Sequence, residues 1–122
     1  MATTTQEIRR DAWSSYFEEL TTALGTVEAT IEVVGRDVGD QIEAERHVLT
    51  DIAYDPEADA IIVGLDAPAP PPERIERRIE QPQRILVATD EPPPLEVVFD
   101  IVDGRQHQWL IRLERPPALP PA

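Results

Sequence analysis

The sequence predicts an α+β domain in which an N-terminal amphipathic helix packs on a strongly curled antiparallel sheet, or on a small open β-barrel, of about six strands. Two observations support this prediction. The spacing of apolar residues changes from a period of 3.6 to a period of 2 near Val27, and short turn sequences separate the alternating segments that follow. Strands with one apolar face must cover that face, and a curled sheet with one helix covers many of them at once.

The length of the chain predicts its domain organisation. With 122 residues it can bury one hydrophobic core but not two independent ones. We therefore predict a single helix-plus-β domain over residues 1–114 and a proline-rich flexible tail over residues 115–122.

The helix is predicted by apolar residues that recur along one helical stripe, with a glycine directly after the last of them. The stripe consists of Trp13, Tyr16, Phe17, Leu20 and Leu24. Gly25 predicts the C-terminal end, and Thr5 is a candidate N-cap. Arg9 and Arg10 would lie at the positive end of the helix dipole, so a start near residue 10 is the alternative.

Alternation of apolar and polar residues predicts the first strands. Residues 27–33 form the first one, and GRDVGD at residues 35–40 supplies a turn. The alternation resumes at Ile42, and a change of parity predicts a bulge within residues 46–49.

The sequence DPEAD at residues 55–59 predicts the turn of a hairpin between residues 49–54 and 60–65. In the predicted register the apolar faces agree. Two pairs define it: Ile52 opposite Val63, and Tyr54 opposite Ile61.

A strand at residues 84–89 and a final hairpin complete the predicted sheet. A three-residue loop at residues 102–104, with Gly104 left-handed, would pair Val97 with Trp109 and keep the apolar faces together. The same register would place two further pairs together: Leu95 with Ile111, and Phe99 with His107.

The segment before residue 84 combines prolines with charges of both signs. Residues 67–72 predict a stiff linker, and residues 73–85 predict a lead-in to the next strand with four arginines and three glutamates. In an extended lead-in, Arg74 and Arg78 would share one face, with Arg77 on the other. A short helix is also compatible with this spacing, so strand, helix and loop all remain possible from sequence.

The charge of the chain excludes several classes of partner. The formal net charge is −13 and the pI is near 4.4, which argues against nucleic acid and anionic membrane. There are no cysteines, so disulfides and thiolate metal sites are excluded. The N-terminal residues lack the apolar run of a signal peptide, and we expect a soluble, cytoplasmic protein.

Five segments, in order and spacing, resemble a family of short bacterial proteins known only as a domain of unknown function. They are IRRDAWSSYF, ATIEVVG, YDPEADAIIVGL, IEQPQRILV and LEVVFDIVDGRQHQWLIRL. The resemblance extends from about Ile8 to Leu113, and its motifs are structural: a Trp-bearing helix, a Tyr-Asp hairpin, an Ile-x-x-Pro lead-in and an Asp-Gly hairpin. It implies the topology described above and no particular activity.

Two functional hypotheses follow. The first is a non-catalytic module that binds another protein or a second copy of itself, since no motif supplies a catalytic residue, a metal site or a cofactor site. The alternative is a small-ligand or anion-binding barrel, with hydrolytic activity as an option, although a small-molecule partner is the less expected one. Its candidate ligand-binding residues are Arg74, Arg77, Arg78, Arg84, His47 and His107.

Overall fold

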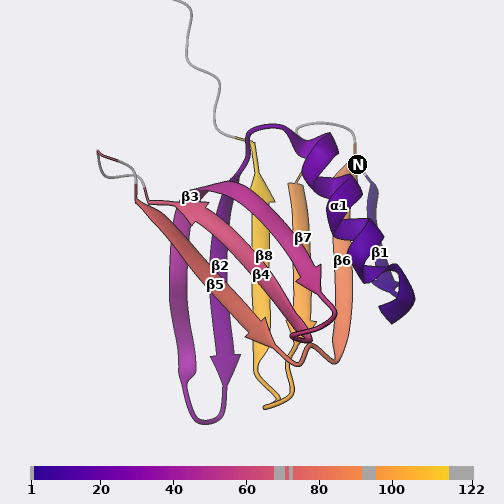
Figure 1. Cartoon of the computed structure of the whole chain (residues 1–122), viewed down its shortest axis with the longest axis vertical. Helices are drawn as coiled ribbons and strands as arrows, with labels where there is room; N and C mark the ends of the chain where they lie inside the picture. Colours follow the sequence, from indigo (N-terminus) through magenta and orange to yellow (C-terminus); the bar gives the residue numbers. More distant parts are fainter. Residues whose placement is uncertain (1, 68–70, 72, 92–95, 116–122) are drawn as a thin grey trace, which may run out of the picture.

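The computed structural model describes residues 2–67, 71, 73–91 and 96–115, and within them the chain forms one α-helix and a single antiparallel sheet of eight strands (Figure 1). The elements are, in order, β1(Ala2–Ile8), the 3-10 helix η1(Arg10–Ala12), α1(Trp13–Leu24), β2(Glu28–Gly35), β3(Gly39–Asp55), β4(Ala60–Asp66), β5(Arg74–Glu80), β6(Arg84–Glu91), β7(Glu96–Val102) and β8(Gln108–Glu114). The α+β class is confirmed. The tail at residues 116–122 and most of the predicted linker lie outside the described residues.

The strands follow the order β1-β6-β7-β8-β2-β3-β4-β5. β1 and β5 are therefore the two edges of one open sheet, and the predicted barrel or strongly curled sheet is wrong. The predicted number of about six strands is also too low. The two additional strands are β1 and β5: the N-terminal segment pairs with β6, and the lead-in pairs with β4.

β1 was not predicted, because the sequence gives it no apolar alternation. Thr5 is not a helix cap but pairs with Ala88 of β6. Of residues 4–8 only Ile8 is buried. Main-chain pairing therefore builds this strand, and main-chain hydrogen bonds leave no sequence pattern.

The helix begins near the alternative position. η1 covers Arg10–Ala12, α1 continues from Trp13, and Gly25 ends it with a φ of 67°. Trp13 and Phe17 are each 1 % exposed. Phe17 packs against Phe99 of β7 with ring centroids 5.5 Å apart, so α1 covers the face of the sheet from which the apolar side chains of β7 project.

Trp13 connects the helix to its surroundings. Its indole Nε1 donates a hydrogen bond of 2.9 Å to the carbonyl of Ile8, and its ring meets Tyr54 of β3 edge to face at 5.1 Å. On the next turns of the helix, the Thr21 hydroxyl donates to the carbonyl of Ile52 at 3.3 Å. The helix is thus fixed against β1, β3 and β7 together.

The hairpin of β3 and β4 has the predicted register, with Ile52 opposite Val63 and Tyr54 opposite Ile61. The expected bulge is also present. The register between β2 and β3 shifts near Arg46, whose φ is 52°, and the register between β3 and β4 shifts after Leu49.

The hairpin of β7 and β8 has a longer loop than predicted. Val97 lies opposite Leu113 rather than Trp109, and the positive φ of 68° belongs to Gln106 rather than to Gly104. The apolar faces still agree, because the register differs by four residues and an even shift preserves the side of each residue. The predicted pair of Phe99 with His107 is wrong, since Phe99 lies opposite Ile111 and Ile101 lies opposite Trp109. Leu95, the predicted partner of Ile111, lies outside the described residues.

Residues 74–80 of the predicted lead-in form the edge strand β5, so of the three conformations left open by the sequence the strand is the one observed. Arg74 and Arg78 are exposed, and Ile79 on the other side is fully buried. β5 pairs with β4 along its whole length, with Arg74 opposite Asp66. No helix among the residues described here is long and apolar enough to cross a membrane.

Candidate functional site

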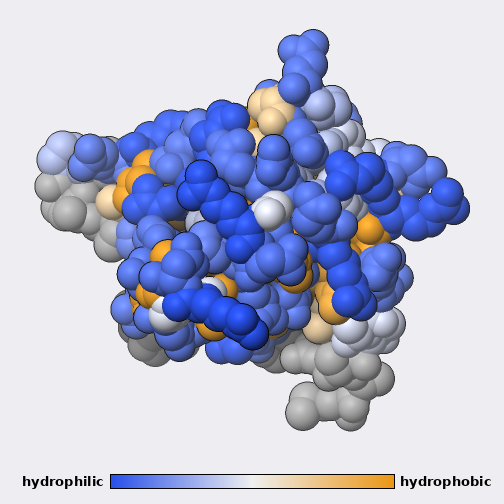
Figure 2. Space-filling view, turned by 90° about the horizontal axis from the view of Figure 1, so that it is seen from below, coloured by the Kyte–Doolittle hydropathy of each residue, from blue (hydrophilic) through white to orange (hydrophobic). Residues whose placement is uncertain are grey.

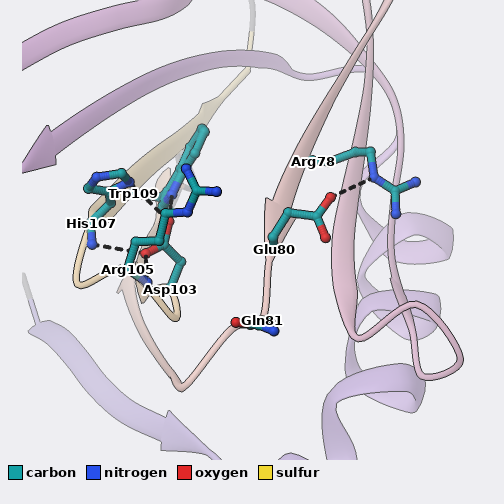
Figure 3. A pocket seen from close by; sticks show the side chains of 7 residues that line it. All are labelled: Arg78, Glu80, Gln81, Asp103, Arg105, His107 and Trp109. Carbon is teal, nitrogen blue, oxygen red and sulfur yellow. Dashed lines mark hydrogen bonds and ion pairs between the residues drawn. The ribbon is translucent and has the colours of Figure 1, made fainter. Parts of the chain in front are cut away.

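A cleft of about 440 Å³ lies between the end of β5 and the loop that joins β7 to β8 (Figure 3). Its lining residues are Arg78, Glu80, Gln81, Asp103, Arg105, His107 and Trp109. In Figure 3, Trp109 and the loop residues form one side, and Glu80 with Arg78 forms the other. The volume is within the range of small-ligand sites in proteins, roughly 300–1,000 Å³.

Asp103 organises the loop side of the cleft. Its side chain is almost completely buried, and Oδ1 accepts hydrogen bonds from the backbone N–H groups of Arg105 at 2.8 Å and His107 at 2.9 Å. Oδ2 accepts from the Trp109 indole Nε1 at 3.0 Å and lies 3.3 Å from His107 Nδ1. The three N–H donors satisfy a carboxylate that would otherwise be costly to bury.

His107 lies between two carboxylates. Its Nδ1 faces Asp103, and its Nε2 lies 2.7 Å from Oδ1 of Asp37 in the turn between β2 and β3. This hydrogen bond is the main reason why the pKa of Asp37 is lowered. Gly35 permits the approach, because a Cβ at this position would lie 2.5 Å from Cδ2 of His107. The imidazole therefore joins the β2–β3 turn to the β7–β8 loop.

The base of the cleft is the contact between Gln81 and Gly104. A Cβ on Gly104 would lie 2.5 Å from Oε1 and 2.9 Å from Cβ of Gln81, so only glycine fits without a shift of the neighbouring turn. Gln81 itself has a φ of 51°, a left-handed conformation that is unfavourable for a residue with a side chain. The two loops are thus packed closely enough to hold the two sides of the cleft together.

Two arginines are among the lining residues of the cleft. Arg78 donates from Nε to Oε1 of Glu80 at 3.0 Å, and this hydrogen bond raises the pKa of Arg78. Arg105 is exposed, and no carboxylate among the described residues lies within ion-pair distance of its guanidinium. Arg105 is therefore the cation best placed to bind a ligand.

Of the predicted ligand-binding residues, Arg78 and His107 line the cleft and the other four lie elsewhere. Arg74 pairs with Asp51 of β3 at 3.0 Å. Arg77 projects to the opposite side of β5, where its Nε lies 3.6 Å from the carboxylate of Glu43. These two arginines link β5 to β3.

Arg84 and His47 are also remote from the cleft. Arg84 pairs with Glu7 across β6 and β1 at 2.9 Å. His47 Nδ1 lies 2.9 Å from the carbonyl oxygen of Glu45 in the bulged part of β3. The six residues therefore do not form one site.

The described lining of the cleft offers little for nucleophilic chemistry. None of its described lining residues is a serine, threonine or cysteine, so His107 has no hydroxyl or thiol beside it to activate. Within the described part of the chain, no group of three or more His, Cys, Asp or Glu residues is arranged to hold a metal ion. Ion pairing and contact with the Trp109 ring are the interactions that the cleft provides.

Sequence reasoning missed Asp37, Asp103, Arg105 and Trp109 as members of this site. The first two were assigned to turns, and Trp109 to the core. A usable signal was present, because an aspartate followed by a histidine four residues later in a loop allows the carboxylate to bind the backbone of the same loop. The contact with Asp37 has no local signal, since 70 residues separate the partners.

A second surface is the outer face of the sheet, defined as the side of β2, β6, β7 and β8 opposite α1. Its residues alternate with buried ones such as Phe99 and Ile111. The apolar ones are Val34, Leu86, Val98, Val102 and Leu110, and the charged ones are Glu28, Glu32, Arg84, Glu96, Asp100, Arg112 and Glu114.

A shallow groove of about 160 Å³ crosses the outer face, with Val98 and Leu110 among its lining residues. Arg112 pairs with Glu96 at 2.9 Å beside it. Glu32 shares a hydrogen bond with Asp40, and this contact between two acidic groups raises the pKa of Glu32.

The end of the molecule that carries the β2–β3 and β7–β8 turns is mainly hydrophilic, with small separate apolar areas (Figure 2).

Comparison with known proteins places the chain in a sequence family. The profile described as "Family of unknown function (DUF5335)" matches residues 4–122. An uncharacterized protein of Aquifex aeolicus (strain VF5) is 29 % identical over 116 residues, which cover 95 % of this chain and 96 % of the relative. No solved structure shows a significant match.

Proposed function

The chain belongs to the DUF5335 family, whose function is unknown, and from its structure we propose that it is a non-catalytic protein-interaction module whose outer face binds a basic segment of another protein. The observation that carries the proposal is the groove at Val98 and Leu110, which lies on the face of the sheet that α1 does not cover. Apolar side chains framed by charged ones are typical of interaction surfaces.

Charge complementarity favours a basic partner. Among its described side chains the outer face carries five carboxylates and two arginines. Arg112 is paired with Glu96, Arg84 with Glu7 of β1, and Glu28 with Arg46 of β3. The carboxylates of this face that remain outside these ion pairs are those of Glu32, Asp100 and Glu114. Glu32 and Asp40 hold their carboxyl groups close together, which is unfavourable when both are ionised. A lysine or arginine placed between them would relieve this repulsion and would be attracted by the net charge of −13.

The same charges argue against a second copy of this chain as the occupant. Two outer faces in contact would bring two sets of carboxylates together, and two chains of charge −13 repel each other before contact. Of the two options raised by the sequence, binding to another protein is therefore preferred over self-association.

The experiment measures binding of a fluorescein-labelled peptide in which lysine alternates with leucine, by fluorescence anisotropy at low and moderate salt. We expect binding that weakens with salt, and a roughly tenfold loss of affinity in the double variant Glu32→Gln, Asp100→Asn. The matched control is Glu18→Gln, Glu19→Gln, which removes the same charge from the exposed side of α1 and leaves the affinity nearly unchanged.

Three results would overturn the proposal. One is equal loss of affinity in the two double variants, which would indicate attraction by overall charge alone. Another is equal affinity for a peptide in which serine replaces leucine, because the apolar groove would then contribute nothing. The third is a stable dimer by light scattering that Leu110→Glu dissociates, since a second copy would then occupy the face.

A further inference from the structure

The geometry of the cleft points to a second binding site, separate from the outer face. We propose that the cleft binds a small aromatic carboxylate, with its carboxylate on Arg105 and its ring against the indole of Trp109. The proposal goes beyond the protein-interaction role and does not depend on it, since the outer face and the cleft share no residue.

Arg105 provides the charged end of the site. A guanidinium offers two parallel N–H donors to a carboxylate. The Arg105 side chain is exposed and makes no close ion pair among the residues the structure describes, although its charge reaches the carboxylate of Asp37 at longer range. Arg78 adds a second positive charge at the opposite side, partly offset by Glu80. The lining holds two arginines and two carboxylates, so the cleft lacks the acidic excess of the chain as a whole.

Asp103 does not oppose an anion as strongly as a free carboxylate would. Its oxygens already accept three hydrogen bonds, two from backbone N–H groups at Oδ1 and one from the Trp109 indole at Oδ2. Its role in the proposal is positioning, because the hydrogen bond of 3.0 Å to Nε1 fixes the plane of the Trp109 ring.

Trp109 provides the apolar end of the site. Its side chain is only partly buried, although it packs against the core cluster, so part of the indole remains available in the cleft. An aromatic ring on a ligand can stack on such a surface and at the same time leave its carboxylate in reach of Arg105. Alkyl carboxylates and inorganic anions could pair with Arg105 but could not stack on the Trp109 ring.

The two tryptophans allow a direct test by NMR. In a ¹⁵N-labelled sample, the indole Nε1–H of Trp109 lies at the cleft, and that of Trp13 is bound to the carbonyl of Ile8 elsewhere. Titration with benzoate should move the Trp109 indole signal in a saturable way, with a Kd on the order of millimolar for so small a ligand. The Trp13 signal should stay in place, and uncharged benzamide should have a much smaller effect.

Amino-acid substitutions test whether the carboxylate of the ligand binds Arg105. Arg105→Gln should weaken benzoate binding by at least about fivefold, because the paired donors are lost. Arg84→Gln makes the same change of charge at the pair with Glu7 and should leave the Kd within about twofold. Benzoate binding that survives in Arg105→Gln, an equal response to benzamide, or equal movement of both indole signals would overturn the proposal.

Discussion

At the scale of single residues, a few polar side chains join segments that are distant in sequence. Asp103 binds its own loop and orients Trp109, and His107 reaches from this loop to Asp37 in another turn. Such contacts cost little when every polar atom is satisfied, and they hold loops that have few apolar residues of their own. The cleft exists because these loops are held in place.

Two acidic residues should give opposite dependences of stability on pH. The pKa of Asp37 is lowered in the folded state, chiefly by the hydrogen bond with His107. Asp37 therefore stabilises the fold at pH values above its unfolded pKa near 3.8, and this stabilisation is lost as the pH falls through the folded pKa. The pKa of Glu32 is raised in the folded state, chiefly by the hydrogen bond with Asp40. The contact therefore stabilises the fold at low pH, and this stabilisation is lost as the pH rises from about 4.5 through the folded pKa.

Urea unfolding between about pH 3 and about pH 7, a range that includes the ordinary pKa values of both groups, measures these effects. Asp37→Asn should reduce the loss of stability on acidification, and Glu32→Gln should stabilise the protein near neutral pH. If the free energy of unfolding of both variants follows the wild type in parallel over the whole range, the two contacts do not persist in solution.

At the scale of elements, contacts between turns fix the position of the β5–β6 turn, which strand pairing alone does not fix. The β5–β6 turn contacts the β7–β8 loop at Gln81 and Gly104, and Arg10 of η1 donates to the carbonyl of Pro82 in the same turn at 2.9 Å. Edge strand β5 is therefore held at its end by contacts outside its pairing with β4.

Gly104→Ala should destabilise the protein, because the new Cβ would overlap Gln81 in the adjacent turn. We expect a loss of about 1–3 kcal/mol, typical of overpacking in a closely packed contact. Gln81→Gly removes the obstructing side chain and suits the positive φ at that position, so the double variant should recover most of the loss. A double variant as unstable as the sum of the single ones would exclude this contact as the cause.

At the scale of the whole molecule, the open sheet leaves one face and two edges to solvent, and the chain carries a net charge of −13. β1 buries only Ile8 among residues 4–8, and β5 carries alternating arginine and glutamate on its outer side. Charged and polar edges of this kind resist pairing with other chains. The proposed partner would therefore use the outer face rather than an edge of the sheet.

The net charge predicts that salt stabilises the fold at neutral pH. Self-repulsion among the carboxylates opposes the compact state, and 0.2 M NaCl should screen it by about 0.5–1 kcal/mol, or roughly 2–4 °C in Tm. The rise in Tm should disappear near the pI of about 4.4, where the net charge vanishes. A fall in Tm at pH 7 would mean that the surface ion pairs stabilise more than the repulsion destabilises.

The sequence by itself determined the class of fold, the helix and most strands, because periodicity and turn residues act locally. It predicted the β3–β4 register and the sides of β7 and β8, since both depend on matching apolar faces. It could not determine the loop of residues 103–107, where the carboxylate of Asp103 replaces the expected tight turn.

Only the tertiary structure decided the strand order, the pairing of β1 and the membership of the cleft. Arg78 and His107 both line the cleft, from opposite sides, together with Arg105 and Trp109. The other candidates, Arg74, Arg77, Arg84 and His47, are engaged elsewhere. The physical reason is that these contacts join residues far apart along the chain, such as Asp37 and His107. Their formation depends on how the whole sheet is assembled, whereas a sequence pattern records only what neighbouring residues require.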